Sequence, residues 1–353
     1  MVVGIGGCTA LLVTGFGIND SIANLANDQF GRIMLYDLSV SFSDNQDAAS
    51  QAAFVAELGD DAAGARFIHQ GSANVAYGDQ TKEVNLIVSD GALDGFIDLH
   101  SGDEALPFPD AGACVISRGL SERCGLNAGD TVTVYDDEMN RMELTISGVF
   151  DNYIYYYLIT SADSVAAQWG EASEINAALV NCAEGEDPHG LSARFASMEG
   201  VSNVTVSQDT RDRFDNMMAS LKYIVILVVV CAAALAFIVL YNLTNINITE
   251  RIREIATVKV LGFTLRETAS YALSENLVLS AMGALVGLPL GHALHAFVMA
   301  QIKVDMVVFD VRVTTLSYVL SVVMTLLFAW LVNLFMLRKI DRINMAESLK
   351  TIE

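Results

Sequence analysis

Four long apolar segments constrain the fold of this chain more than any other feature of its sequence. They are residues 1–18, 223–243, 269–300 and 314–337. The hydrocarbon core of a bilayer is ~30 Å thick, and a helix needs about 20 mostly apolar residues to cross it. The first, second and fourth segments contain no Asp, Glu, Lys or Arg, and uncharged runs of this length are rare in soluble domains. We therefore predict four transmembrane helices.

Charge is distributed unevenly along the sequence. The 353 residues carry a formal charge of −22, although 53% of them are hydrophobic. Residues 19–220 contain 33 Asp and Glu but only 9 Lys and Arg, whereas residues 221–353 contain 9 acidic and 11 basic residues. Acidic and apolar residues are thus segregated, which predicts a separate acidic domain, residues 19–222, between the first two helices.

The position of the basic residues predicts the orientation in the membrane. Lys and Arg cluster in residues 244–268, after the second helix, and in the tail, residues 338–353, whereas the connection 301–313 is balanced in charge. Loops rich in Lys and Arg stay in the cytoplasm, so the two basic segments are predicted to be cytoplasmic. The acidic domain and the short outer loop then face outward. We expect a multi-pass protein of a bacterial cytoplasmic membrane.

The acidic domain is predicted to have an α+β fold. Runs rich in β-branched residues and bounded by Gly, Asp or Asn predict strands at residues 84–88, 113–117, 131–135 and 142–149. Residues 177–206 have the pattern strand, helix, strand, and the ends of the domain, 19–30 and 209–221, are helical. The fold class is therefore a membrane α-helical protein with four transmembrane helices and an α+β extracytoplasmic domain between helices 1 and 2.

The acidic domain has no catalytic or metal-binding signature in its sequence. Its tyrosine-rich run, residues 153–157, fits a ligand-stacking surface, but a strand packed on both faces is the preferred interpretation. Cys114 and Cys124 fit either a disulfide or two thiols. The acidity would attract a cationic substrate, and it also serves simply to keep an exported domain soluble.

The start of the chain departs from the usual pattern of a first membrane span. A basic cytoplasmic flank is missing, and so are the basic region and cleavage site of a signal peptide. We therefore expect that the chain lacks its natural N-terminus.

Residues 247–263, NITERIREIATVKVLGF, form the most informative segment. Thr249 is predicted to cap a helix that begins at Glu250, and Gly262 is predicted to end it. The helix is amphipathic, with its apolar and charged residues on different faces. The apolar face holds Ile248, Ile252, Ile255 and Ala256, and the charged residues are Arg251, Glu254 and Lys259. Periodicity alone fits a docking element for another protein or a simple anchor at the membrane surface.

The pattern Glu250-Arg-x-Arg-Glu-Ile-Ala-x-x-Lys-x-Leu-Gly262 resembles the segment after the second span of FtsX/MacB-type ABC transporter permeases. The third predicted span continues the resemblance, with Glu275 near its inner end and a repeated small-x-x-x-small spacing at Gly283, Gly287 and Gly291. Such spacing lets helix backbones approach closely. The layout of one span, a large outer domain and three spans is also that of the family. The resemblance implies an N-terminally truncated chain or the C-terminal half of a larger permease.

The resemblance also implies which residues act. It assigns ATPase coupling to Glu250, Arg251, Arg253, Glu254, Lys259 and Gly262, and helix packing to Gly283, Gly287, Gly291 and Glu275. No Gly-x-x-x-x-Gly-Lys-Ser/Thr motif occurs in the chain, so ATP would be bound by a separate cytoplasmic ABC ATPase subunit. We expect no catalytic residue, cofactor or metal in the chain itself. The expected partners are the ATPase, a second permease half (identical, different or fused) and the lipid bilayer, but no nucleic acid.

The predicted function is that of a permease subunit that couples ATP hydrolysis to the export or extraction of a peptide, lipoprotein or drug. Two alternatives stay open. A non-transporting regulator of the same architecture would activate a cell-wall hydrolase or sense antibiotics. A membrane-anchored receptor without an ATPase would explain the spans and the outer domain but not residues 250–262.

Overall fold

The computed structural model describes residues 2–23, 25–78, 80–136, 139–170, 173–261, 265–302 and 307–341. The chain divides into two compact units. The helical unit comprises Met1–Ala23, Met218–Ile302 and Val311–Glu353, and the outer domain comprises Asn24–Met217 and Lys303–Asp310.

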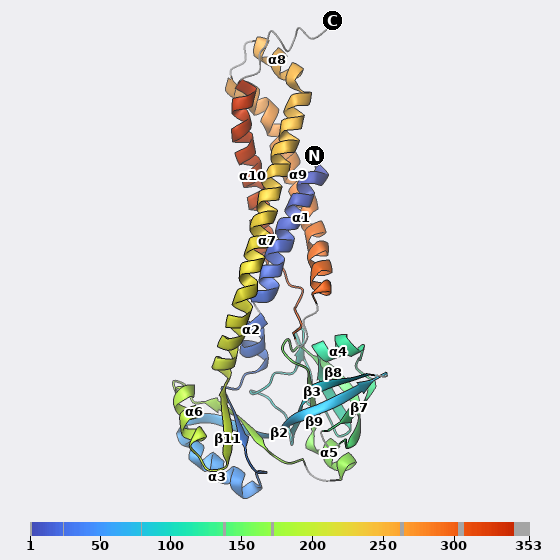
Figure 1. Ribbon diagram of the computed structural model, residues 1–353, viewed down its shortest axis with the longest axis vertical. Coiled ribbons are helices and arrows are strands. Elements are labelled where there is room, and N and C mark those ends of the chain that lie inside the picture. The colour runs from blue at the N-terminus through green and yellow to red at the C-terminus, as the bar shows by residue number, and fades with distance from the viewer. Residues whose placement is uncertain are drawn as a thin grey trace. The chain divides into compact units, whose positions relative to one another are not determined.

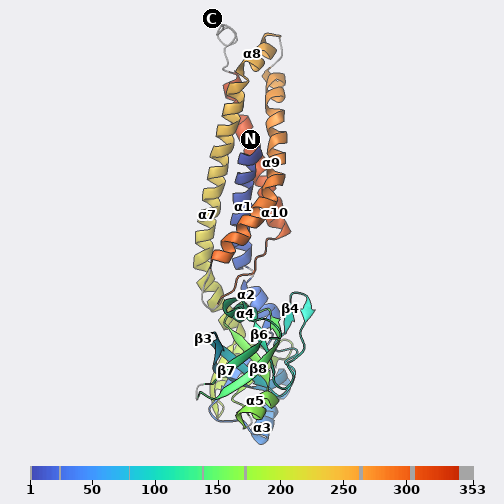
Figure 2. The same cartoon turned by 90° about the vertical axis from the view of Figure 1, so that its right-hand side faces the viewer.

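The helical unit is built from long apolar helices. Its described helices are α1 (Val2–Ala23), the greater part of α7 (Ser207–Glu250), α8 (Ile252–Val260), α9 (Leu265–Gln301) and α10 (Thr315–Asp341). Four stretches are long and apolar enough to cross a membrane: Val2–Ile33, Val225–Glu250, Leu277–Gln301 and Thr315–Leu337. Figures 1 and 2 both show α1, α9 and α10 side by side. The four helices expected from the sequence are present.

Helix α1 lies against the glycine-rich face of α9. A methyl group added at Gly287 would lie 2.6 Å from the carbonyl oxygen of Gly6 and 2.6 Å from Cβ of Thr9. Gly283 and Gly291 are equally close to α1, where an added Cβ would come within 2.7 Å and 2.6 Å of its side chains. Lipid tails are as apolar as leucine, so helices in a bilayer associate through close van der Waals packing of this kind. The glycine stripe is therefore occupied by a helix of the same chain.

Hydrogen bonds join α1 to the α10 region at two levels. Thr9 Oγ1 lies 3.0 Å from Thr325 Oγ1 in the buried interior. Asp20 Oδ2 accepts hydrogen bonds from the backbone nitrogen and from Oγ1 of Thr314, both at 2.9 Å, just before α10 begins. These bonds link α1 to the α10 region near its middle and near its end, in addition to the bonds that the threonine hydroxyls make within their own helices.

Helix α7 packs on the rest of the unit through a narrower contact. Leu240 of α7 is buried in a cluster with Ile5 of α1 and with Val332 and Met336 of α10. Large apolar residues remain exposed on α7, among them Tyr223, Ile226, Leu227, Val230 and Ile238. In a membrane this apolar surface is available to lipid or to another transmembrane helix.

The outer domain contains the strands and the short helices. The helices are α2 (Leu25–Asp28), α3 (Ala48–Leu58), α4 (Arg118–Cys124), α5 (Ala162–Trp169) and α6 (Pro188–Ala196), with the π-helix η1 (Gln29–Ile33) and the 3-10 turn η2 (Gly59–Asp61). The strands are β1 (Leu38–Phe42), β2 (Ala62–Tyr77), β3 (Gln80–Ser89), β4 (His100–Ser101), β5 (Glu104–Ala105), β6 (Ala113–Ser117), β7 (Thr131–Tyr135), β8 (Arg141–Phe150), β9 (Tyr157–Ser161), β10 (Ala177–Cys182) and β11 (Val201–Val206). The described strands, apart from the small β4–β5 pair, form a sheet in the order β11-β1-β10-β2-β3-β9-β6-β8-β7.

One lobe of the outer domain is an open antiparallel sheet covered by two helices. Its strands follow the order β11-β1-β10-β2, and α3 and α6 connect β1 to β2 and β10 to β11. Figure 1 shows α3 and α6 together beside β11. Phe54 of α3 and Phe195 of α6 pack with Val40 and Val180 in the core between sheet and helices. This arrangement of two interleaved β-α-β units is ferredoxin-like.

The second lobe is a closed barrel inserted between β2 and β10. Strand β2 pairs with β10 through its first half and with β3 and β7 through its second half. The β2–β7 pairing closes the ring β2-β3-β9-β6-β8-β7, which leaves these strands without a free edge. Ile116, Leu144 and Leu158 are fully buried inside it.

The strands expected from the sequence are confirmed. Strands β6 and β7 have the expected bounds, while β3 and β8 extend beyond the expected segments at one or both ends. The strand-helix-strand pattern of residues 177–206 is β10, α6 and β11. The helical ends are confirmed as well, by α2 and η1 on one side and the start of α7 on the other.

The glycine contact between α1 and α9 leads to a stability prediction. We expect Gly287→Ala to lower the resistance of the detergent-solubilised protein to unfolding by about 1–3 kcal/mol, the usual cost of overpacking. Gly7→Ala is the matched control, because an added Cβ there meets nothing within 4 Å. Unfolding in a titration with dodecyl sulfate measures both. Equal midpoints for the two variants would contradict the close contact.

Candidate functional site

The corner between α7 and α8 holds the residues that the sequence singled out. Helix α7 ends at Glu250, and α8 begins at Ile252. Ile255 and Ala256 of α8 are 2% and 0% exposed and join Ile248 in the buried cluster that contains residues of α10. The apolar face of this corner is thus packed against the helical bundle.

Charged side chains lie on the opposite side of the corner. Glu250, Arg253 and Glu254 are exposed, and Arg251 is half-buried. Lys259 lies within α8, but its side chain is not among the described residues, and Gly262 lies outside them altogether. Three of the six residues assigned to coupling are therefore grouped on one accessible surface of charged side chains.

The expected start of this helix is wrong. Thr249 does not cap a helix beginning at Glu250, because α7 continues through both residues. Its hydroxyl instead donates a hydrogen bond to the carbonyl of Asn245 at 2.7 Å, four residues earlier. Threonine hydroxyls bond in this way inside helices. The helix breaks only at Arg251, and the backbone bond from Ile255 N to Arg251 O, 3.0 Å, carries the chain into α8.

The residues assigned to helix packing all lie in α9. Gly283, Gly287 and Gly291 face α1, as described above. Glu275 belongs to the same helix, but the structure does not describe its side chain.

A buried glutamine anchors the outer domain just after α2. Gln29, 2% exposed, donates to Asn152 Oδ1 at 2.8 Å and accepts from the backbone nitrogens of Tyr153 and Ile154 at 2.9 and 3.2 Å. The Asn152 amide in turn donates to the carbonyls of Ile154 and Tyr155 at 2.8 and 3.0 Å. Two amide side chains thus satisfy the polar backbone of an irregular segment, which no local sequence pattern could have indicated.

The outer loop between α9 and α10 joins the same segment. Val307 forms an antiparallel bridge with Ile154, and the backbone nitrogen of Val308 donates to Tyr153 O at 2.8 Å. The segment around Tyr153 therefore contacts two other parts of the chain. One is η1, through Gln29, and the other is the loop between α9 and α10, through Val307 and Val308.

The strand expected over residues 153–157 is wrong. Only Tyr157 belongs to β9, and the preceding residues are irregular because Gln29 and Asn152 take their backbone hydrogen bonds. Tyr153 and Tyr156 are buried, whereas Tyr155 is 48% exposed and has a φ of 62°. A tyrosine in this left-handed region is strained by about 1–2 kcal/mol and is held there by its surroundings.

The cysteines of the outer domain are free thiols in this structure. Cys114 is fully buried in the barrel, and burial raises its pKa to about 12. The pKa of Cys182 is raised to about 11, first by burial and then by the Asp37 carboxylate beside it.

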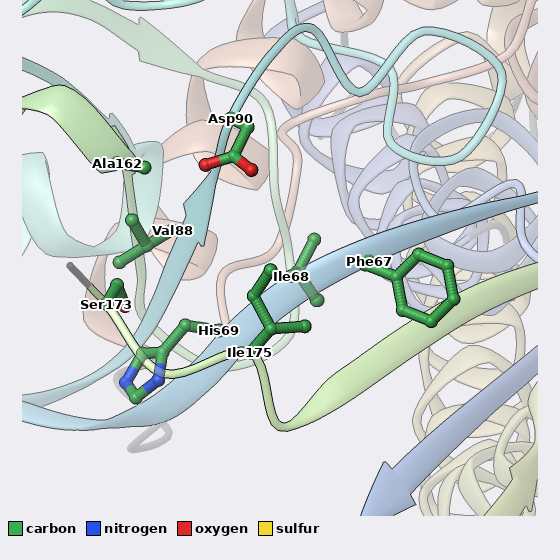
Figure 3. A pocket seen from close by; sticks show the side chains of 8 residues that line it. All are labelled: Phe67, Ile68, His69, Val88, Asp90, Ala162, Ser173 and Ile175. Carbon is green, nitrogen blue, oxygen red and sulfur yellow. The ribbon is translucent and has the colours of Figure 1, made fainter. Parts of the chain in front are cut away.

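The described parts of the chain hold no recognisable metal site, and one small hollow lies in the outer domain. No group of three or more His, Cys, Asp or Glu could hold a metal there. Figure 3 shows a hollow where the two lobes meet, with the Asp90 carboxylate and the His69 ring at opposite ends. The enclosed space has room for only about one water molecule, far less than the ~300–1,000 Å³ of small-molecule pockets.

Comparison with known proteins covers both units. Residues 1–198 match the family described as the MacB-like periplasmic core domain, and residues 226–345 match the FtsX-like permease C-terminal family. No curated protein matches the chain significantly.

Three solved structures each resemble about half of the chain. The periplasmic region of MacB from Actinobacillus actinomycetemcomitans is 12% identical, with a TM-score of 0.33, over 52% of this chain and 94% of that one. The extracellular domain of the noncanonic ABC-type transporter YknZ from Gram-positive bacteria is 14% identical, with a TM-score of 0.30, over 47% and 99%. A domain of a permease protein from Porphyromonas gingivalis is 18% identical, with a TM-score of 0.30, over 46% and 81%.

The Gln29 anchor predicts a large loss of stability on substitution. Gln29→Leu leaves two backbone nitrogens and the Asn152 oxygen unpaired, each at about 1–3 kcal/mol, so we expect the outer domain to lose about 3 kcal/mol or more. The chain has two tryptophans, and a Trp330→Phe background leaves Trp169 in the outer domain as the fluorescent reporter of denaturant unfolding. Gln70→Leu, at an exposed position of β2, is the control. Equal effects of the two substitutions would refute the anchor.

The raised pKa of Cys182 predicts slow alkylation that speeds up with pH. The thiolate is the reactive form, and a pKa about two units above the ordinary 9.0 leaves about a hundredfold less thiolate at pH 8. We expect the rate with iodoacetamide to rise about tenfold per pH unit up to about pH 11. Asp37→Asn should accelerate the reaction at pH 8, because it removes a neighbouring negative charge. A rate that is independent of Asp37 would contradict this.

Proposed function

Since the chain belongs to the family of FtsX-like permeases with a MacB-like periplasmic core domain, we propose that it couples ATP hydrolysis by a separate ABC ATPase to work outside the membrane. That work is the export or extraction of a peptide, lipoprotein or drug. The chain itself is not an enzyme, and ATP binds to the partner subunit. It resides in a bacterial cytoplasmic membrane with its acidic domain outside.

The α7–α8 corner supports this proposal best. Its apolar face is fixed in the bundle through Ile255 and Ala256, while Arg253 and Glu254 project from the exposed side. An anchor that only lay on the membrane would direct its apolar face to lipid, whereas this face is packed against other helices of the chain. A force applied to the charged side is therefore transmitted to the bundle.

The hydrogen-bonded segment around Tyr153 is the proposed place at which movement of the spans is passed to the outer domain. The segment around Tyr153 is held by Gln29 of η1, shortly after α1, and by Val308, which precedes α10. Strand β11 is followed directly by α7, the helix that ends at the proposed ATPase contact. Movements of three spans thus reach the outer domain through short, hydrogen-bonded connections.

A second permease half completes the proposed assembly. The glycine stripe of α9 is occupied by α1, so it is not the surface on which two permeases meet. The exposed apolar residues of α7, such as Ile226 and Val230, are the proposed contact with that half.

The ATPase contact is tested by reversing one charge. We expect Arg253→Glu to reduce the amount of ATPase subunit that co-purifies with the full-length protein by about tenfold or more. The captured protein is identified by its Walker A motif and its ATP hydrolysis. Arg141→Glu, an exposed arginine of the outer domain paired with Glu143, is the control. Unchanged co-purification of the Arg253→Glu protein would overturn the assignment of the coupling surface.

A further inference from the structure

Arg66 is an unusual charged residue in the outer domain, because one nitrogen of its half-buried guanidinium has no partner in the part of the chain that the structure describes. Its Nε atom is buried and has no hydrogen-bond partner among the described residues. No ion pair from a described carboxylate reaches it either. A buried donor of a charged group is costly to leave unpaired, and the 33 acidic residues of this region offer many potential partners. An unpaired buried group of this kind calls for an explanation, such as an external ligand.

A second unpaired atom lies beside Arg66. Asn181 Nδ2 donates to the carbonyl of Gly95 at 2.9 Å, which fixes the orientation of the amide. The Oδ1 atom of Asn181 therefore points away from Gly95, and it is buried without a partner among the described residues. The site therefore combines an unsatisfied cationic donor with an unsatisfied neutral acceptor.

The strand register places these two side chains close together. Arg66 on β2 is opposite Leu179 on β10, and Asn181 is opposite Gly64, so the two residues are diagonal neighbours with Cα atoms about 7–8 Å apart. Their neighbours Ala65 and Val180 pack toward α3 and α6. Because side chains alternate along a strand, Arg66 and Asn181 share the opposite face of the open sheet.

The charges of this sheet favour an anionic group at Arg66. Strands β1, β2, β10 and β11 contain no Asp or Glu, and Arg66 is their only Lys or Arg. The adjoining loop approaches the guanidinium through a glycine, since a Cβ added at Gly91 would lie 3.9 Å from Arg66 Nη1. Ile68, which shares the face of Arg66, and Asp90 line the hollow shown in Figure 3. Arg66 and Asn181 are each half-buried, so both side chains are partly accessible from solvent.

We propose that Arg66 and Asn181 bind the carboxyl terminus of a peptide. A guanidinium binds a carboxylate through two parallel hydrogen bonds. The Asn181 oxygen requires an N–H donor, and the last peptide N–H of a chain lies next to its terminal carboxylate. A neutral or cationic peptide is the expected ligand, because the net charge of −24 over residues 19–220 repels anions as a whole. Binding needs no ATPase, so it is tested separately from the proposed coupling.

The test uses the full-length protein in detergent without an ATPase. The probe is the peptide Lys-Gly-Ala-Ala with a free carboxylate, labelled at its N-terminus with zwitterionic tetramethylrhodamine so that it is neutral overall, and it is compared by fluorescence polarisation with the same peptide as a carboxamide. We expect saturable binding of the acid and at least tenfold weaker binding of the amide. Arg66→Gln should weaken binding of the acid at least tenfold and abolish the preference, while Arg66→Lys should keep part of it. Asn181→Leu should weaken both peptides, and Arg141→Gln should change neither.

Three outcomes would overturn the proposal. They are the absence of saturable binding to the unsubstituted protein, equal affinity for acid and amide, and unchanged affinity after Arg66→Gln. The comparison of acid with amide on the unsubstituted protein does not depend on any variant being folded. Inorganic phosphate is added as a competitor, and displacement at the same concentration as acetylated Lys-Gly-Ala-Ala acid would also overturn the proposal, because the site would then bind anions in general.

Discussion

The structure depends on the close contact between α1 and α9. A bilayer provides no hydrophobic force to press two helices together, so their association relies on surfaces that fit without intervening side chains. Gly283, Gly287 and Gly291 provide such a surface, and α1 lies in it with its backbone next to theirs. Helix α1 leads directly into the anchored start of the outer domain. The helix that precedes the outer domain in sequence is therefore held by backbone contact with α9.

Hydrogen bonding divides the outer domain into two kinds of polar site. Around Gln29 and Asn152 each described amide group finds a partner, and the irregular tyrosine segment is held by side chains in place of a strand partner. Around Arg66 and Asn181 one atom of each side chain remains unpaired. A satisfied network stabilises a single arrangement. The unsatisfied pair is less buried than Gln29 and Asn152, and we propose that its unpaired atoms gain partners when a ligand binds.

The sequence was informative where structure is local. Transmembrane helices require runs of apolar residues, and strands such as β6 and β7 require runs of β-branched residues. Both patterns lie within one short stretch of sequence, so both elements were predictable. The amphipathic face around Ile255 was also predictable from its spacing. By contrast, Gln29 bonds to Asn152 across 123 positions, and β2 closes the barrel by pairing with β7. The Thr249 cap failed for the same reason, because the packing of Ile248 in the bundle extends α7 past a residue that favours helix starts.

Strand β2 belongs to both lobes of the outer domain. Its first half pairs within the open sheet and its second half within the barrel, in one uninterrupted run from Ala62 to Tyr77. Deleting or inserting one residue in this strand would turn every later side chain to the opposite face, exchanging core and solvent in the other lobe. The two lobes therefore share one alternation of inward and outward side chains along β2, and a change in length is expected to be better tolerated at turns such as that at Gly78 than within the strand.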